Sequence, residues 1–209
     1  MRLPSYTAER RVFDRLKSGC SDQAKLEYEL AFNTLIERYN TTIYENRFIT
    51  GGAVEVFTYA LLCSVGIDCT LCADQSKAGD ILLPNDKKLL SLKGTFTGGA
   101  SDVKLINQLG EGNRSWVTAT FFIISEVGIV YGDPSMVDDE YIRPVADGLT
   151  LKRKAVVELI DDPSNIFPMK LCRKPPTEMT DRSHKASTAV AKQIMLEMKT
   201  YRLLNAFNP

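Results

Sequence analysis

Three side chains in the first half of the chain have types and spacing suited to metal-dependent chemistry: Glu55, Asp80 and Lys93. Asp80 opens a short apolar segment, 79–84, and Lys93 lies near the end of an alternating segment, 88–97. If both segments are strands of one hairpin, the two side chains meet at the same open end. There, carboxylates can hold a divalent cation through oxygen, and a lysine can face a water and a phosphate. The spacing therefore predicts a metal-dependent site for phosphodiester chemistry.

Such a site needs a helix beside the strands, and segment 53–65 predicts one because it is apolar on nearly every side. Glu55 is the only charge in this segment and lies in its predicted first turn, where a carboxylate suits the helix dipole. A carboxylate on a buried helix otherwise needs a partner, which a metal cleft would provide. Capping and metal binding both stay open for Glu55. The residues Thr50, Gly51 and Gly52 predict a break just before the helix.

The remaining segments predict the elements that surround this core. Apolar residues at helical spacing indicate helices over 8–39 with a break near 18–19, and Leu26 and Leu30 widen the apolar surface of the second helix. Segment 116–125 is the most strand-like, which indicates a central strand. Further predictions are a strand at 68–73, a short helix at 100–109, a strand at 127–131, a loop-rich stretch at 133–149, a segment of ambiguous type at 151–160 and a terminal helix at 186–205.

Together these elements predict an α/β fold with a mixed central sheet flanked by helices, and with helical N-terminal and C-terminal regions. One domain would span 1–209, with the core at about 51–131, N-terminal helices at 8–39 and a C-terminal loop and helix region at 132–209. No segment reaches the roughly 18 apolar residues of a membrane span, and the first residues lack an apolar signal. We therefore expect a cytoplasmic protein with no membrane partner. No GxxxxGK[ST] pattern occurs, so no nucleotide cofactor is expected.

Charge and rare residue types exclude several classes of function. The chain has 26 lysines and arginines and 26 aspartates and glutamates, and this zero net charge argues against broad electrostatic binding of nucleic acid. It does not exclude a nuclease whose basic residues line one cleft. A single histidine, His184, excludes sites that need several histidine ligands. The five cysteines are expected to be reduced thiols.

The order of Glu55, Asp80, Ser91 and Lys93 resembles the PD-(D/E)xK nuclease motif, in which a helix acid, a strand acid and a (D/E)xK strand converge on divalent cations. Gly79 stands in place of the motif's proline, and Ser91 stands in place of its second strand acid. The stretch SLKGTF is similar to an SxK branch of the type II restriction endonucleases. In that branch the missing acid comes from the helix after the lysine strand.

This resemblance implies a restriction-endonuclease-like sheet and a catalytic set of Glu55, Asp80, Ser91 and Lys93. Glu55 and Asp80 would hold Mg²⁺, for which Mn²⁺ can substitute. Lys93 would stabilise the developing negative charge or orient the attacking water. Ser91 would hydrogen-bond a metal-bound water.

The implied function is a type II site-specific endonuclease that cuts double-stranded DNA as a homodimer. Glu111 is the obvious candidate for the missing acid, and Asp102 competes with it. Two alternatives stay open. One is a structure-specific repair or junction nuclease of the same fold, and the other is a non-catalytic DNA- or protein-binding module with a degenerate metal site. The recognition sequence and the cleavage position do not follow from these motifs.

Overall fold

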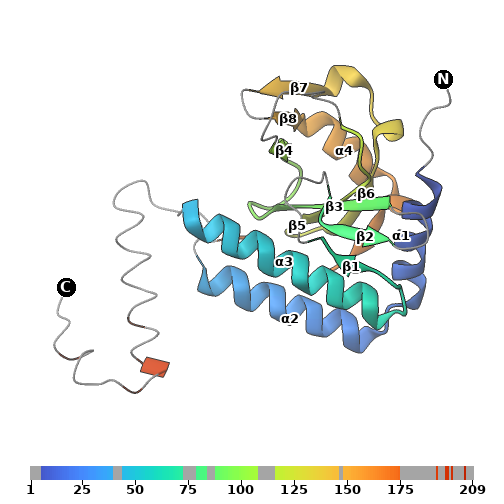
Figure 1. Cartoon of the computed structure of the whole chain (residues 1–209). Coiled ribbons are helices and arrows are strands. Elements are labelled where there is room, and N and C mark those ends of the chain that lie inside the picture. The colour runs from blue at the N-terminus through green and yellow to red at the C-terminus, as the bar shows by residue number, and fades with distance from the viewer. Residues whose placement is uncertain are drawn as a thin grey trace.

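The computed structural model describes residues 6–39, 44–72, 79–83, 88–107, 116–145 and 148–174, together with a few isolated positions after them. These residues form a mixed α/β structure in which helices flank a mixed sheet (Figure 1). At this level the predicted fold class is confirmed. Within these ranges no helix has the length and the apolar character that a membrane span requires.

The elements below are those of the described ranges. The helices are α1 (Thr7–Gly19), α2 (Asp22–Arg38), α3 (Tyr44–Ser64) and α4 (Arg153–Asp161), with 3-10 turns η1 (Pro134–Met136), η2 (Asp139–Tyr141) and η3 (Pro163–Asn165). The main sheet contains β1 (Thr70–Leu71), β2 (Ile81–Leu83), β3 (Lys88–Thr95), β5 (Thr120–Ile124), β6 (Gly128–Gly132) and β9 (Ile166–Pro168). The second sheet contains β4 (Val103–Asn107), β8 (Gly148–Leu151) and β7 (Ile142–Val145).

The main sheet has the strand order β1-β2-β3-β5-β6-β9. Its neighbours are antiparallel except for β3 and β5, which are parallel. A parallel pair needs a long crossover, and here the crossover passes through β4, which pairs with β8 in the second sheet. The predicted pairing of segments 79–84 and 88–97 is confirmed, because Ile81 lies opposite Leu90 in an antiparallel ladder.

Both faces of the main sheet are covered. Figure 1 shows α1, α2 and α3 on one side and α4 with the second sheet on the other. Phe121 and Ile123 of β5 belong to the apolar cluster under α1–α3, whereas Phe122 and Ile124 belong to the cluster under α4. Since both faces are buried, every residue of β5 is buried, and four apolar residues, 121–124, follow one another in the sequence.

The two N-terminal helices confirm the prediction for 8–39, including the break. Ser21 caps α2, because its side-chain oxygen accepts a hydrogen bond of 3.2 Å from the Ala24 N–H. Tyr28, Phe32 and Leu35 form the buried stripe of α2. This stripe packs on the core, as its helical spacing indicates.

The predicted break at 50–52 is wrong, because α3 runs without interruption from Tyr44 to Ser64. Glycines inside a helix cost only about 1 kcal/mol each relative to alanine, a cost that the packing of a long helix exceeds. Gly66 closes the end of the helix, because its φ of +72° allows its N–H to donate to the Cys63 carbonyl at 2.9 Å. The Ile67 N–H donates to the Leu62 carbonyl at 3.1 Å, which completes a Schellman cap.

Other predictions differ more. Segment 100–109 is not a helix: Val103–Asn107 form β4, and residues 108–109 lie outside the described residues. The strand at 68–73 is reduced to β1. The stretch 133–149 contains β7 and the start of β8, and the ambiguous segment 151–160 contains most of α4. The terminal helix at 186–205 falls outside the described ranges except at isolated positions.

Candidate functional site

Asp80 lies directly before β2, and its backbone is held between two strands. Its N–H donates to the Leu90 carbonyl at 2.9 Å, and its carbonyl accepts from the Cys72 N–H at 2.9 Å. The side chain is held as well, because Oδ2 accepts a hydrogen bond of 2.5 Å from the Leu92 N–H. The carboxylate is therefore fixed at the open end of the β2–β3 pair, where the sequence placed it.

Lys93 lies beside Asp80 on β3. Its Nζ is 3.9 Å from Asp80 Oδ2, and the two side chains are 29% and 22% exposed. At this distance the pair interacts electrostatically without forming a short hydrogen bond. Lys93 therefore remains able to contact a ligand that approaches from solvent.

Glu55 is the third charged group of the site. The pKa of its carboxyl is raised from 4.5 to about 7, first because the side chain is partly buried and then because the negative charge of Asp80 is near. The positive charge of Lys93 opposes this rise. Glu55 therefore lies within electrostatic range of both other groups. The three charged side chains come from α3, from the residue directly before β2 and from β3.

The position of Glu55 in α3 decides between the two explanations of this residue. Since α3 begins at Tyr44, Glu55 lies in the middle of the helix and not in its first turn. The helix dipole acts within the first and last turns, so it does not account for a carboxylate here. The capping explanation is therefore wrong, and metal binding is the explanation of Glu55 that stays open.

Ser91 supports Asp80 and does not face solvent. It is 5% exposed, and its Oγ donates a hydrogen bond of 3.1 Å to Asp80 Oδ2. Its backbone N–H donates to the Ala119 carbonyl at 2.9 Å, which ties β3 to the start of the β5 segment. The hydroxyl at the position of the expected acid therefore orients the existing carboxylate.

The missing acid is not found among the described residues. Asp102 accepts a hydrogen bond of 2.8 Å from the Arg153 N–H at the start of α4, and its Oδ2 lies 3.6 Å from Arg143 Nη2. These contacts assign Asp102 to the junction of the second sheet with α4. Glu111 lies outside the described residues. Across the ranges that the structure describes, no group of three or more histidine, cysteine, aspartate or glutamate side chains is arranged to hold a metal.

Sequence reasoning missed one contributor, the backbone N–H of Leu92. The contact of this N–H with Asp80 could have been predicted from the register of the β2–β3 hairpin. Because β2 begins at Ile81 opposite Leu90, the N–H of Leu92 extends past the start of the neighbouring strand and needs another acceptor. The Asp80 carboxylate provides it.

Comparisons with known proteins do not add to this description. No protein-family model, curated protein or solved structure matches the chain significantly. The function has to be inferred from the residues of the site.

Proposed function

We propose that this protein is a metal-dependent endonuclease that hydrolyses phosphodiester bonds of double-stranded DNA. The observation that supports it most is the convergence of Glu55, Asp80 and Lys93 from three different elements. Two partly buried carboxylates beside a lysine are suited to binding a cation and a phosphate together. The order of these residues along the chain is that of the PD-(D/E)xK motif.

A divalent cation fits the donors that are present. Burial and, after it, the negative charge of Asp80 raise the pKa of Glu55, and a hard cation between the carboxylate oxygens would offset the charge repulsion. Mg²⁺ is the proposed ion, with Mn²⁺ as a substitute. When bound, such an ion polarises the phosphate and lowers the pKa of a coordinated water.

The protein groups have separate tasks in this proposal. Lys93 contacts the scissile phosphate and stabilises the negative charge that develops on it. Ser91 and the Leu92 N–H hold Asp80 Oδ2, so the carboxylate is oriented before any ligand binds. Orientation of this kind reduces the entropy that is lost when the cation and the substrate assemble.

The finer proposal is a type II restriction endonuclease that acts as a homodimer on a palindromic site. The succession of α3, β1, β2 and β3, followed by a parallel β5, supports a restriction-endonuclease-like sheet. One difference is that β4 occupies the described part of the crossover where we expected a helix. Two-fold symmetry of the protein would match the symmetry of the site.

A second candidate is a non-catalytic binding module, and one observation favours it. The described residues bring together two carboxylates but no third histidine, cysteine or carboxylate side chain for a metal, and Asp80 Oδ2 already accepts two hydrogen bonds. Such a protein would bind DNA or a protein without cleaving a phosphodiester bond.

Digestion of a long duplex DNA, with and without Mg²⁺, tests the main proposal. We expect discrete fragments that require the metal and that disappear for Asp80→Asn and Lys93→Met. Asp68→Asn and Lys104→Met are matched controls, because both side chains are exposed and outside the site. Circular dichroism and urea unfolding of each variant show whether the fold is intact.

The outcomes separate the candidates. Equal cleavage by the site variants would refute the site, whatever the activity of the protein. Cleavage of branched DNA alone would replace the restriction enzyme by a junction nuclease. Absence of cleavage of any DNA by the wild type, with Mg²⁺ or Mn²⁺, would favour the binding module.

A further inference from the structure

Two adjacent glycines lie inside α3, one turn before Glu55. Gly51 and Gly52 are four and three residues before Glu55. Residues three and four apart are neighbours on a helix surface, so these glycines are the two N-terminal neighbours of Glu55. Long side chains of a helix lean toward its N-terminus, which directs the Glu55 side chain over the turn that the glycines form. This turn of α3 therefore presents bare backbone beside a carboxylate of the site.

Packing within the described part of the chain does not account for the two glycines. A glycine inside a helix is less favourable than alanine, so it usually has a packing reason. A Cβ added at Gly51 or at Gly52 would have no described heavy atom within 4 Å, apart from its chain neighbours and the helix backbone around it. By contrast, a Cβ at Gly132 would lie 2.8 Å from Leu159 Cδ1. The space beside Glu55 is therefore kept open although helix stability favours a side chain there.

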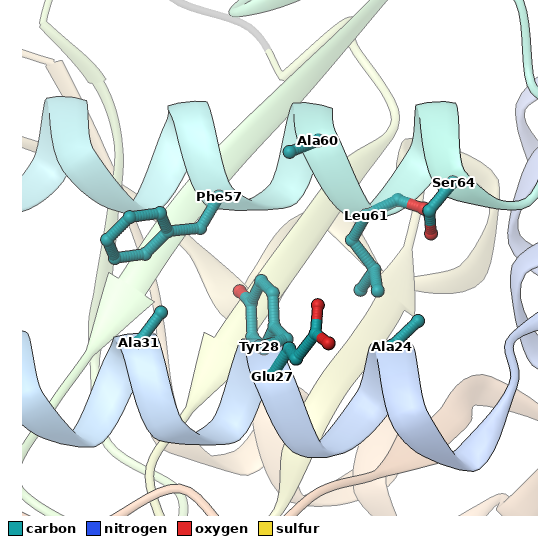
Figure 2. A pocket seen from close by; sticks show the side chains of 8 residues that line it. All are labelled: Ala24, Glu27, Tyr28, Ala31, Phe57, Ala60, Leu61 and Ser64. Atoms are coloured by element: carbon teal, nitrogen blue, oxygen red, sulfur yellow. The ribbon is translucent and has the colours of Figure 1, made fainter.

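The protein covers two other sides of α3. The core side buries Thr58, and Figure 2 shows Phe57 on the side that faces α2. The side of Gly51 and Gly52 is different, because both glycines are partly exposed. Figure 1 also shows that the first turns of α3 extend past the strands of the main sheet. A ligand can therefore reach the helix backbone at the glycines.

The charges near this turn indicate an anionic ligand. Lys93 acts electrostatically on Glu55, so a cation that can contact a phosphate is close to the same turn. Its side chain is 29% exposed, and its Nζ is 3.9 Å from Asp80 Oδ2. The glycines bring no charge of their own. Glycine is the residue that lets a backbone approach a ligand closely.

The size of the open turn fits one unit of a nucleic-acid strand. Gly51 is about 40° from Glu55 around the helix, and Gly52 is about 60° from it in the other direction. The two glycines therefore clear both flanks of Glu55. One helical turn is about 5.4 Å long, whereas the phosphates of one DNA strand are about 3.4 Å apart along the duplex axis. The turn is long enough for the backbone of about one nucleotide next to the reacting phosphate.

We propose that the sugar–phosphate backbone of the bound DNA strand crosses α3 at Gly51 and Gly52. The nucleotide next to the scissile phosphate then packs on bare helix backbone, and the scissile phosphate lies at Lys93. This inference rests on the proposed function and adds two positioning residues to the site. A side chain at either glycine would push the strand outward, and a displacement of about 1 Å from the reacting geometry can slow a reaction about a hundred-fold.

Substitutions at the glycines separate stability from cleavage. We expect Gly51→Ala and Gly52→Ala to raise the midpoint of urea unfolding, because alanine favours a helix and the space for a Cβ is open. The same variants should lower kcat/KM for cleavage of duplex DNA by about ten-fold, and Gly51→Leu by about a hundred-fold. Ala60→Leu is the matched control, because Ala60 is exposed on the same helix about 140° from Glu55. Its kcat/KM should stay within about two-fold of the wild-type value.

Protection of an introduced thiol measures the contact without cleavage. The thiol of a Gly52→Cys variant should react with N-ethylmaleimide in the free protein. It should react at least five-fold more slowly when the protein is saturated with duplex DNA and Ca²⁺, a hard cation that takes oxygen ligands. The thiol of an Ala60→Cys variant should react equally fast with and without DNA. Peptide mass spectrometry distinguishes these thiols from the five native cysteines.

The outcomes separate the path of the strand from the proposed function. Cleavage by the wild type with undiminished cleavage by Gly51→Leu would refute the strand path and leave the nuclease standing. Protection of Gly52→Cys by DNA without any cleavage would support the strand path in a protein that only binds DNA. Equal reactivity of this thiol with and without DNA would overturn the inference. A lower unfolding midpoint of Gly51→Ala would overturn it as well, because residues of the chain itself would then fill the space.

Discussion

Glu55 should make the metal-free protein less stable at neutral pH than at acidic pH. The pKa of its carboxyl is raised to about 7 in the folded protein from 4.5, its usual value. Between these two values the folded state binds more protons than the unfolded state, so the free energy of unfolding falls as the pH rises. The contribution of Glu55 is therefore favourable below about pH 4.5 and is lost by about pH 7.

The magnitude follows from the size of the rise in pKa. At about 1.4 kcal/mol for each unit of pKa, a rise from 4.5 to about 7 corresponds to roughly 3 kcal/mol. Solvent screens a carboxylate that is only partly buried, which reduces the expected effect to about 1–2 kcal/mol. Glu55→Gln removes the titration and keeps the shape of the side chain. We therefore expect the stability of this variant, relative to the wild type, to increase by about 1–2 kcal/mol between pH 4.5 and pH 8.

Urea unfolding followed by circular dichroism, in EDTA across this pH range, measures the difference. Glu158→Gln is the control, since Glu158 is exposed on α4 and its replacement should give a nearly constant difference. Addition of Mg²⁺ above pH 7 should stabilise the wild type by linkage and leave Glu55→Gln almost unchanged. A difference between Glu55→Gln and wild type that does not vary with pH would refute the raised pKa of Glu55.

Three further variants test the supports of the site and the fold. Ser91→Ala removes one hydrogen bond to Asp80, so we expect a loss of about 1 kcal/mol in urea unfolding and a several-fold slower cleavage of plasmid DNA. Asp102→Ala should cost a similar amount of stability, because it removes the hydrogen-bond acceptor of the Arg153 N–H at the start of α4. The cleavage rate of this variant should stay within about two-fold of the wild-type rate. A complete loss of cleavage would instead show that Asp102 belongs to the catalytic site. Gly66→Ala forces a side chain into a φ of +72°, so the midpoint of thermal unfolding should fall by an amount equivalent to about 1–2 kcal/mol.

Local periodicity explains which parts of the fold could be predicted from the sequence. The antiparallel pairing of β2 and β3 follows from alternating residues on either side of a turn, and it was enough to bring Asp80 and Lys93 together. The helices α1 and α2 follow from an apolar stripe with a capping serine between them. In each case the information lies in neighbouring segments of the chain.

The structural predictions that were wrong failed for different physical reasons. The start of α3 was misplaced because Gly51 and Gly52 were taken as a break, although a long helix compensates for two glycines. This error also placed Glu55 in a first turn and made capping a plausible role. For β4, a local signal was overlooked: Val103 and Leu105 are buried and Lys104 is exposed, which is the alternation of a strand. Its partner β8 lies more than 40 residues later, beyond the reach of local reasoning.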